Sequence, residues 1–218
     1  MAGRVPGRFS AGLARRVALL LDRAYLSTRI VGRKHVPKSG PVILAGNHSG
    51  LLDGPVVIGA APRGTHFLIK AELVRGLAGK IFLLAGQVPV NRSDGRAALE
   101  ICLKVLQDGR VVGIFPEGTR GTGRVGGIHA GVAWLAVNSG APVIPVACLG
   151  TRREGESIHK IPSFRRRVHV EFGNPISLPD PAPTTQESIA AAIPIIHQAL
   201  AAHVAEVERR TALPLPTT

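Results

Sequence analysis

The sequence Pro41-Val-Ile-Leu-Ala-Gly46 predicts a β-strand buried on both faces, because it is a short apolar run bounded by turns. Similar segments recur along the chain and alternate with helix-like ones. The other expected strands are Thr65–Ile69, Gly86–Arg92, Val111–Phe115, Pro142–Leu149 and Val168–Phe172. Strands that alternate with helices predict an α/β fold: a single layered domain with a mainly parallel or mixed central sheet flanked by helices.

Helix-like segments lie between and beyond these strands. They cover Leu13–Thr28, a short stretch from Ala71, Ser93–Gln107, His129–Asn138 and a long alanine-rich segment near the C-terminus. Ser93 is expected to cap its helix, and Gly109 to close it. Thr184 and Glu187 have the spacing of a capping box at the start of the last helix, which Pro194 is expected to bend.

The N-terminal helix is amphipathic and basic. One face carries Leu13, Val17, Leu20, Leu21 and Ala24. Residues 1–35 contain a single acidic side chain, Asp22, and these basic ones: Arg4, Arg8, Arg15, Arg16, Arg23, Arg29, Arg33 and Lys34. This bias favours a membrane-interface segment over residues 1–30, followed by a catalytic domain over residues 31–218. An ordinary helix packed on the core, with a solvated basic face, fits the pattern equally well.

Composition narrows the choice of partner. The net charge of +13 favours a polyanion, either an anionic membrane surface or nucleic acid. Aromatic residues make up only 4% and no nucleic-acid-binding motif is present, so no nucleic acid is expected. The apolar runs are short, so we expect no spanning helix. Cys102 and Cys148 lie in apolar stretches, and unpaired thiols suit a reducing cytosol.

Polar residues repeatedly follow the strand-like segments, which is where open α/β sheets bind their ligands. His48 and Asp53 form the sharpest pair: a histidine accepts a proton near neutral pH, and a carboxylate on its other ring nitrogen fixes the tautomer. Five residues apart, they meet if His48 lies in a loop and Asp53 in the first turn of a helix. A solvated loop histidine and a helix-terminal aspartate are the alternatives.

A second group is cationic. Lys70, Arg92 and Arg120 follow three different strand-like segments and could converge on a phosphate. Glu117, beside them, could accept a hydrogen bond from a substrate hydroxyl or orient an arginine. Unrelated surface charges are the alternative.

Four blocks of this sequence, in order, resemble the glycerolipid acyltransferase family, which includes bacterial 1-acyl-glycerol-3-phosphate acyltransferases of the PlsC type. The blocks are Asn47-His-Ser-Gly-Leu-Leu-Asp53 (the His-x4-Asp motif), Gly86-Gln-Val-Pro-Val-Asn-Arg92, Phe115-Pro-Glu-Gly-Thr-Arg120 and Val143-Ile-Pro-Val146. The similarity runs from about Val31 to Gly150 and includes Lys70 in a stretch similar to the family's lysine block. One block alone is weak, whereas four in order are specific.

The resemblance implies a role for each matched residue. His48 would remove the proton of the acceptor hydroxyl, with Asp53 orienting it. An acceptor phosphate would be held by Lys70, Arg92 and Arg120, within a site shaped by Glu117, Gly118 and Thr119, while Pro145 would lie on the acyl-donor side. The co-substrate would be acyl-CoA or acyl carrier protein, and neither a metal nor a further cofactor is implied.

The expected activity is acylation of lysophosphatidic acid to phosphatidic acid by a peripheral, monotopic protein on the cytoplasmic face of the cell membrane. After the third block the family often has Ser and then Phe-Lys-x-Gly, whereas here Gly121 follows Arg120 and Ile128-His-Ala-Gly131 comes later. This departure leaves another lysophospholipid or a glycolipid open as acceptor. A non-catalytic basic module that binds membranes or nucleic acid is the alternative from a different class.

Overall fold

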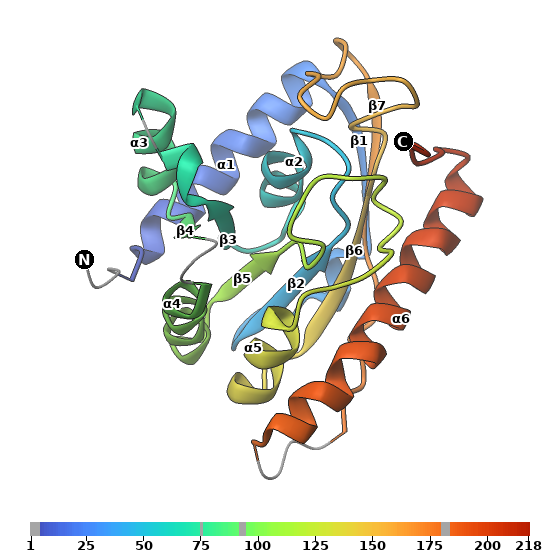
Figure 1. Cartoon of the computed structure of the whole chain (residues 1–218). Coiled ribbons are helices and arrows are strands. Elements are labelled where there is room, and N and C mark those ends of the chain that lie inside the picture. The colour runs from blue at the N-terminus through green and yellow to red at the C-terminus, as the bar shows by residue number, and fades with distance from the viewer. Residues whose placement is uncertain (1–4, 75, 92–94, 180–183) are drawn as a thin grey trace.

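Seven strands form one sheet at the centre of the computed structural model (Figure 1), which describes residues 5–74, 76–91, 95–179 and 184–218. Their order across the sheet is β1-β7-β6-β2-β5-β3-β4. The strands are β1 (Ser27–Val31), β2 (Val42–Gly46), β3 (Thr65–Lys70), β4 (Val88–Val90), β5 (Val111–Ile114), β6 (Val143–Leu149) and β7 (Arg167–Phe172).

Five neighbouring strands, β6, β2, β5, β3 and β4, run parallel to one another. The strand β7 is antiparallel to β6, and β1 is parallel to β7, so the sheet is mixed at one end. Every residue of β2 is buried, which is what helices on both faces of a parallel sheet produce. The predicted fold class, an α/β domain with a mainly parallel or mixed sheet, is confirmed.

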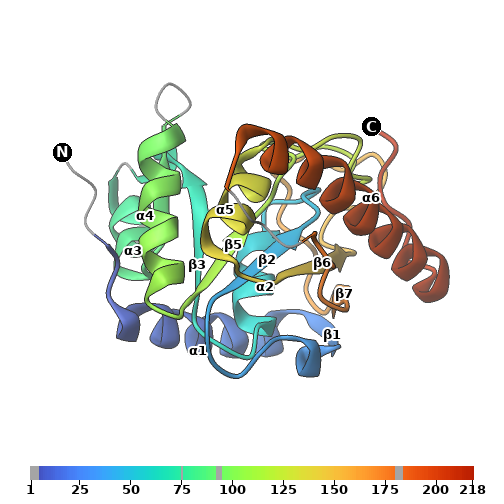
Figure 2. The same ribbon diagram turned by 90° about the horizontal axis from the view of Figure 1, so that it is seen from below.

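Helices cover both faces of the sheet (Figure 2). They are α1 (Arg8–Tyr25), α2 (Asp53–Ala60), α3 (Gly76–Leu84), α4 (Gly95–Gln107), α5 (Gly131–Ser139) and α6 (Gln186–Thr211), with short 3-10 turns at Arg33–His35 and Ala71–Val74. The core on the side of α2 includes Val57, Phe67 and Phe172. The core on the other side joins α4, α5 and α6, with Leu106 and Leu200 among its fully buried side chains.

The predicted N-terminal helix is present, but its apolar face points to solvent, whereas an ordinary surface helix packs that face on the core. Its apolar stripe faces outward, and the exposed large side chains on it are Phe9 (95%), Leu13 (62%), Val17 (47%), Leu20 (67%), Leu21 (64%) and Tyr25 (39%). The buried residues of α1 are Ala11 and Asp22, and its backbone lies close to α2. A Cβ placed on Gly59 of α2 would lie 2.8 Å from the Leu19 amide nitrogen.

The helix α1 ends at Tyr25, earlier than the predicted Thr28, because Ser27–Val31 instead forms the edge strand β1. Ser27 pairs with Arg167, and Val31 with Glu171. The proposed segment boundary at residue 30 therefore falls inside a strand of the sheet.

The last helix, α6, is the one helix in the described ranges that is long and apolar enough to cross a membrane, which differs from the sequence expectation. Ile196, Leu200 and Val204 on one of its faces are buried in the core, so the helix is used as a packed layer over the sheet. Its capping box is formed by Thr185 and Ser188, one residue later than predicted. Pro194 lies within the helix, as expected.

Candidate functional site

The carboxyl ends of the parallel strands meet along one edge of the sheet, and the predicted polar residues follow them there. His48 comes two residues after β2, Glu117 three residues after β5, and Lys70 is the last residue of β3. Because β5 lies between β2 and β3, the loop that contains Glu117 is flanked by the ends of both neighbours. This edge is therefore the candidate active site.

His48 and Asp53 are in direct contact. His48 lies in the loop after β2, and Asp53 is the first residue of α2, as their spacing predicts. Nδ1 of His48 donates to Oδ2 of Asp53 across 2.9 Å. The Asp53 side chain is fully buried, and Oδ2 also accepts from the backbone N–H groups of Ser49 (2.7 Å) and Gly50 (2.8 Å). A carboxylate placed in this way fixes the histidine tautomer.

The imidazole of His48 is also held by stacking. Its ring lies on the Phe115 ring with centroids 4.2 Å apart and planes 9° apart, and Phe115 in turn packs against Phe67. No hydrogen bond to Nε2 is found among the residues that the structure describes. Because the side chain is 19% exposed, Nε2 is available to accept a proton from a bound hydroxyl.

Glu117 holds the main chain of His48. Its Oε1 accepts from the His48 backbone N–H at 2.7 Å, and Gly121 N–H donates to the His48 carbonyl at 3.0 Å. Burial raises the pKa of the Glu117 carboxyl, and the hydrogen bond from His48 opposes that rise. The sequence suggested a contact from Glu117 to substrate or to an arginine, whereas the structure gives it an anchoring contact.

The structure describes two of the three predicted phosphate ligands, Lys70 and Arg120. Arg120 donates from Nη1 to the Ile158 carbonyl at 2.8 Å and lies 3.5 Å from Nδ1 of His159. Lys70 is half-buried at the end of β3. Arg92 follows the edge strand β4 and lies outside the described residues. Their joint role in binding a phosphate therefore stays a prediction.

The position of Gly118 favours glycine for two reasons: its backbone is left-handed, with φ +72, and a neighbouring side chain lies close to it. A Cβ at this position would lie 2.6 Å from the ring of His129, the residue that departs from the family pattern. Thr119 beside it is exposed. The third block is thus a tight turn, closed by the hydrogen bond from Gly118 N–H to the Phe115 carbonyl, with His129 lying against it.

Pro145 belongs to a strand and not to a loop. It is buried within β6, aligned with Ala45 of β2, and its carbonyl accepts from Gly173 N–H at 2.8 Å. The donor-side role that the resemblance implied for Pro145 stays a prediction. Two residues beyond the fourth block, the backbone of Cys148 exchanges two hydrogen bonds with the Asn47 side chain of the first block.

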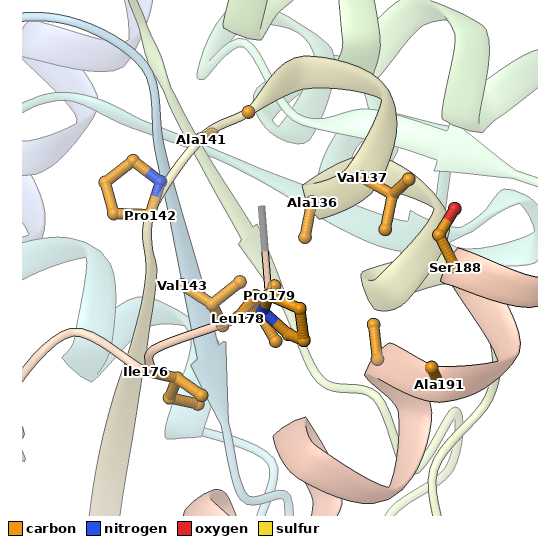
Figure 3. Close-up of a pocket in the computed structure, with 12 residues that line it drawn as sticks. Ala136, Val137, Ala141, Pro142, Val143, Ile176, Leu178, Pro179, Ser188 and Ala191 are labelled. Carbon is orange, nitrogen blue, oxygen red and sulfur yellow. The ribbon is translucent and has the colours of Figure 1, made fainter. Parts of the chain in front are cut away.

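The structure also has an apolar cavity of about 340 Å³, and none of the candidate-site residues lines it (Figure 3). Its walls come from the end of α5, the start of β6, the segment after β7 and the start of α6, and include Val137, Pro142, Leu178 and Ala191. It therefore lies at the end of β6 opposite to Asp53. Among the described residues that line it, the one side-chain hydroxyl, that of Ser188, takes part in the capping box of α6, and no titratable side chain is present.

One contact of the candidate site was missed from the sequence. The hydroxyl of Thr151 donates a short hydrogen bond to Oδ1 of Asp53, and the Cys148 thiol lies 3.7 Å from the same oxygen. The signal was available, because Thr151 is the first polar residue after the β6 segment and so belongs to the same edge of the sheet.

Known proteins are similar to this chain in sequence, and one solved structure is similar in fold. A 1-acyl-sn-glycerol-3-phosphate acyltransferase of Borreliella burgdorferi is 33% identical over 129 residues, which cover 56% of this chain and 51% of that protein. The enzyme of the same name from Bacillus subtilis is 26% identical over 155 residues, covering 70% and 75%. The chain spans about half the length of several curated relatives that it matches.

The crystal structure of the 1-acyl-sn-glycerophosphate acyltransferase PlsC from Thermotoga maritima superposes with a TM-score of 0.67 at 20% identity, over 92% of this chain and 78% of that one. This likeness concerns the fold. Residues 27–149, more than half of the chain, match the family model described as Acyltransferase. Together with the four sequence blocks, that match shows that this chain belongs to the acyltransferase family.

Proposed function

We propose that this chain transfers a fatty acyl group from an acyl thioester to the free hydroxyl of lysophosphatidic acid, giving phosphatidic acid for phospholipid synthesis. The observation that carries the proposal is the His48–Asp53 pair, with Nδ1 bonded to the carboxylate and Nε2 available. The relatives are named 1-acyl-sn-glycerol-3-phosphate acyltransferases, which supports the choice of acceptor.

The proposed reaction follows from that geometry. Nε2 of His48 removes the proton of the acceptor hydroxyl as its oxygen attacks the thioester carbonyl. The tetrahedral intermediate collapses with cleavage of the carbon–sulfur bond, and the proton on His48 passes to the departing thiolate. Asp53 stabilises the imidazolium that forms in between. The donor is acyl-CoA or acyl carrier protein, and no metal or further cofactor takes part in these steps.

The acceptor phosphate is assigned by resemblance to Lys70, Arg92 and Arg120. Another lysophospholipid or a glycolipid remains a candidate acceptor, because His129 stands against Gly118 where the family pattern differs. A different acceptor leaves the proton transfer unchanged and alters only the groups that hold the rest of the molecule.

We also propose that the chain works as a peripheral protein at an anionic membrane surface, on the cytoplasmic face. The outward apolar stripe of α1 and the net charge of +13 support this, because apolar side chains and cations both favour such a surface. Both cysteines are unpaired, as is usual in a reducing compartment.

The test is a panel of lysophospholipid and glycolipid acceptors with one acyl-CoA, followed by thiol release and lipid analysis. We expect lysophosphatidic acid to be turned over fastest, and His48→Ala to lower turnover by about 1,000-fold or more while the protein stays folded. Absence of thiol release with every acceptor, using both CoA and carrier-protein thioesters, contradicts the proposed activity. Full turnover by His48→Ala contradicts the proposed mechanism.

A further inference from the structure

The two oxygens of the Asp53 carboxylate have different partners. Oδ2 accepts a hydrogen bond from His48 and two more from backbone N–H groups of the same loop. Oδ1 faces the other way, toward the end of β6, where it accepts from the hydroxyl of Thr151 and lies near the Cys148 thiol. A thiol is a weak donor, so the threonine hydroxyl is the main partner of this buried oxygen.

Glycines in two backbone segments, the turn after β6 and the His48 loop, leave space for the Thr151 hydroxyl beside Asp53. Directly after β6, Gly150 turns the chain at φ +88, and a Cβ there would lie 2.4 Å from the Arg167 carbonyl oxygen, so only glycine fits. Thr151 then packs against Gly50 of the His48 loop. A Cβ on Gly50 would lie 2.9 Å from the Thr151 hydroxyl oxygen. Two glycines thus make room for one fully buried hydroxyl.

We propose that Thr151 is a positioning residue for the acyl-transfer reaction: its hydroxyl fixes the rotation of the Asp53 carboxylate, so that Oδ2 stays aligned with Nδ1 of His48. The physical reason is that the terminal torsion of an aspartate is soft and broad, so its hydrogen bonds decide its angle. Burying a carboxylate oxygen without a strong hydrogen-bond donor costs free energy. Without the threonine hydroxyl, the Asp53 carboxylate would therefore rotate toward another donor.

This inference rests on the proposed function and gives a role to the chain that directly follows the fourth block. The end of β6 and the turn after it support the base of the reaction through Asp53. Thr151 does not contact substrate in this proposal, because its side chain is buried and its hydroxyl donates to Asp53.

The experiment compares Thr151→Val, which keeps the shape and removes the hydroxyl, with Thr151→Ser, which keeps the hydroxyl. Thr65→Val is the matched control, because Thr65 is equally buried but donates to the Arg63 carbonyl at the far end of β3. The measurements are kcat and KM from thiol release and the midpoint of thermal unfolding. Should valine not fit beside Gly50, Thr151→Ala is measured by the same criteria.

We expect Thr151→Val to lower kcat by about 10- to 100-fold, the rate equivalent of losing one hydrogen bond to a charged group, with KM unchanged. Thr151→Ser should recover kcat to within a few-fold, and Thr65→Val should keep the kcat of the original protein even if its unfolding midpoint falls. A merely structural threonine would instead give the same result for both valine variants.

Failure of this inference is distinguishable from failure of the proposed function. A valine variant with unchanged kcat, in a protein that is active and depends on His48, overturns the role of Thr151 alone. A serine variant as slow as the valine variant also overturns it, since the hydroxyl would then not be the group that matters. An original protein that transfers no acyl group to any acceptor overturns the proposed function, and this role falls with it.

Discussion

His48 is fixed at its ring and at its main chain by different parts of the molecule. Asp53 and Phe115 set the ring, while the backbone N–H donates to Glu117, which lies 69 residues later in the sequence. The base is therefore placed by the joining of the first and third blocks. This arrangement makes the third block as important for the geometry of His48 as for any contact with a phosphate.

Substitution of Glu117 separates anchoring from substrate binding. We expect Glu117→Gln to keep most of the turnover, because its amide oxygen still accepts from the His48 N–H, whereas Glu117→Ala should lower kcat about tenfold with KM little changed. Steady-state kinetics of thiol release measures both values. If both substitutions instead raise KM equally, Glu117 binds substrate and the anchoring role is wrong.

For individual residues, the sequence predicted the His48–Asp53 pair but not the contacts that hold it in place. The spacing of His48 and Asp53 predicted a loop residue facing the first turn of a helix, and the structure has that arrangement. Contacts such as those of Glu117 with a main-chain amide, or Thr151 with a carboxylate, depend on which loops meet. A single sequence has no periodicity that reports such meetings, so these roles became visible only in the fold.

Among the elements, α1 shows that an amphipathic sequence pattern does not determine which face of a helix packs on the protein. The apolar stripe was evident from the sequence, but the face that packs on α2 was not, because it consists of small and polar residues around Ala11 and Ala18. Close backbone contact through Gly59 replaces the usual burial of leucines. The strand β1 was missed for a related reason: Ser27–Val31 is a short edge strand that follows the helix almost directly.

The α1 stripe is testable by charge substitution. Removal of residues 1–30 would also remove most of β1, so we prefer the double substitution Leu13→Glu and Leu20→Glu. We expect less sedimentation with anionic vesicles, and an unfolding free energy within about 0.5 kcal/mol of the original, because both leucines are mainly exposed.

The control for that experiment is the double substitution Ala190→Glu and Ala205→Glu, which places the same two negative charges on the exposed side of α6. It should leave vesicle binding nearly unchanged. Equal binding by the α1 double variant and the original protein would refute α1 as the contact.

On the scale of the whole molecule, His66 ties together three regions at the amino end of the sheet. Its Nδ1 donates to the Gly86 carbonyl at 2.6 Å, and its Nε2 accepts from Arg110 at 2.5 Å. Burial, assisted by the positive charge of Arg110, lowers the pKa of His66 from 6.5 to about 4. Asp108 pairs with Arg110, and Arg8 lies close to both.

This histidine predicts a loss of stability in mild acid. Because its pKa is lower in the folded protein, its contribution is complete above pH 6.5 and is lost as the pH falls through about 4, by roughly 2 to 3 kcal/mol. Urea unfolding of the original protein and of His66→Asn at several pH values between 4 and 7 measures it. The asparagine variant should lack this pH dependence, and an equal slope in both proteins would contradict the assignment.

The pairing of β1 with β7 has a consequence for synthesis of the chain. Ser27 emerges early, but its partner Arg167 is made only after most of the protein has followed. At ordinary rates of translation, this delay is on the order of ten seconds. During it, α1 is already long enough to present its outward leucines to a lipid surface, while β1 is still an unpaired edge. If membrane contact begins on the ribosome, it therefore precedes closure of the sheet, and the nascent chain would complete its fold already attached.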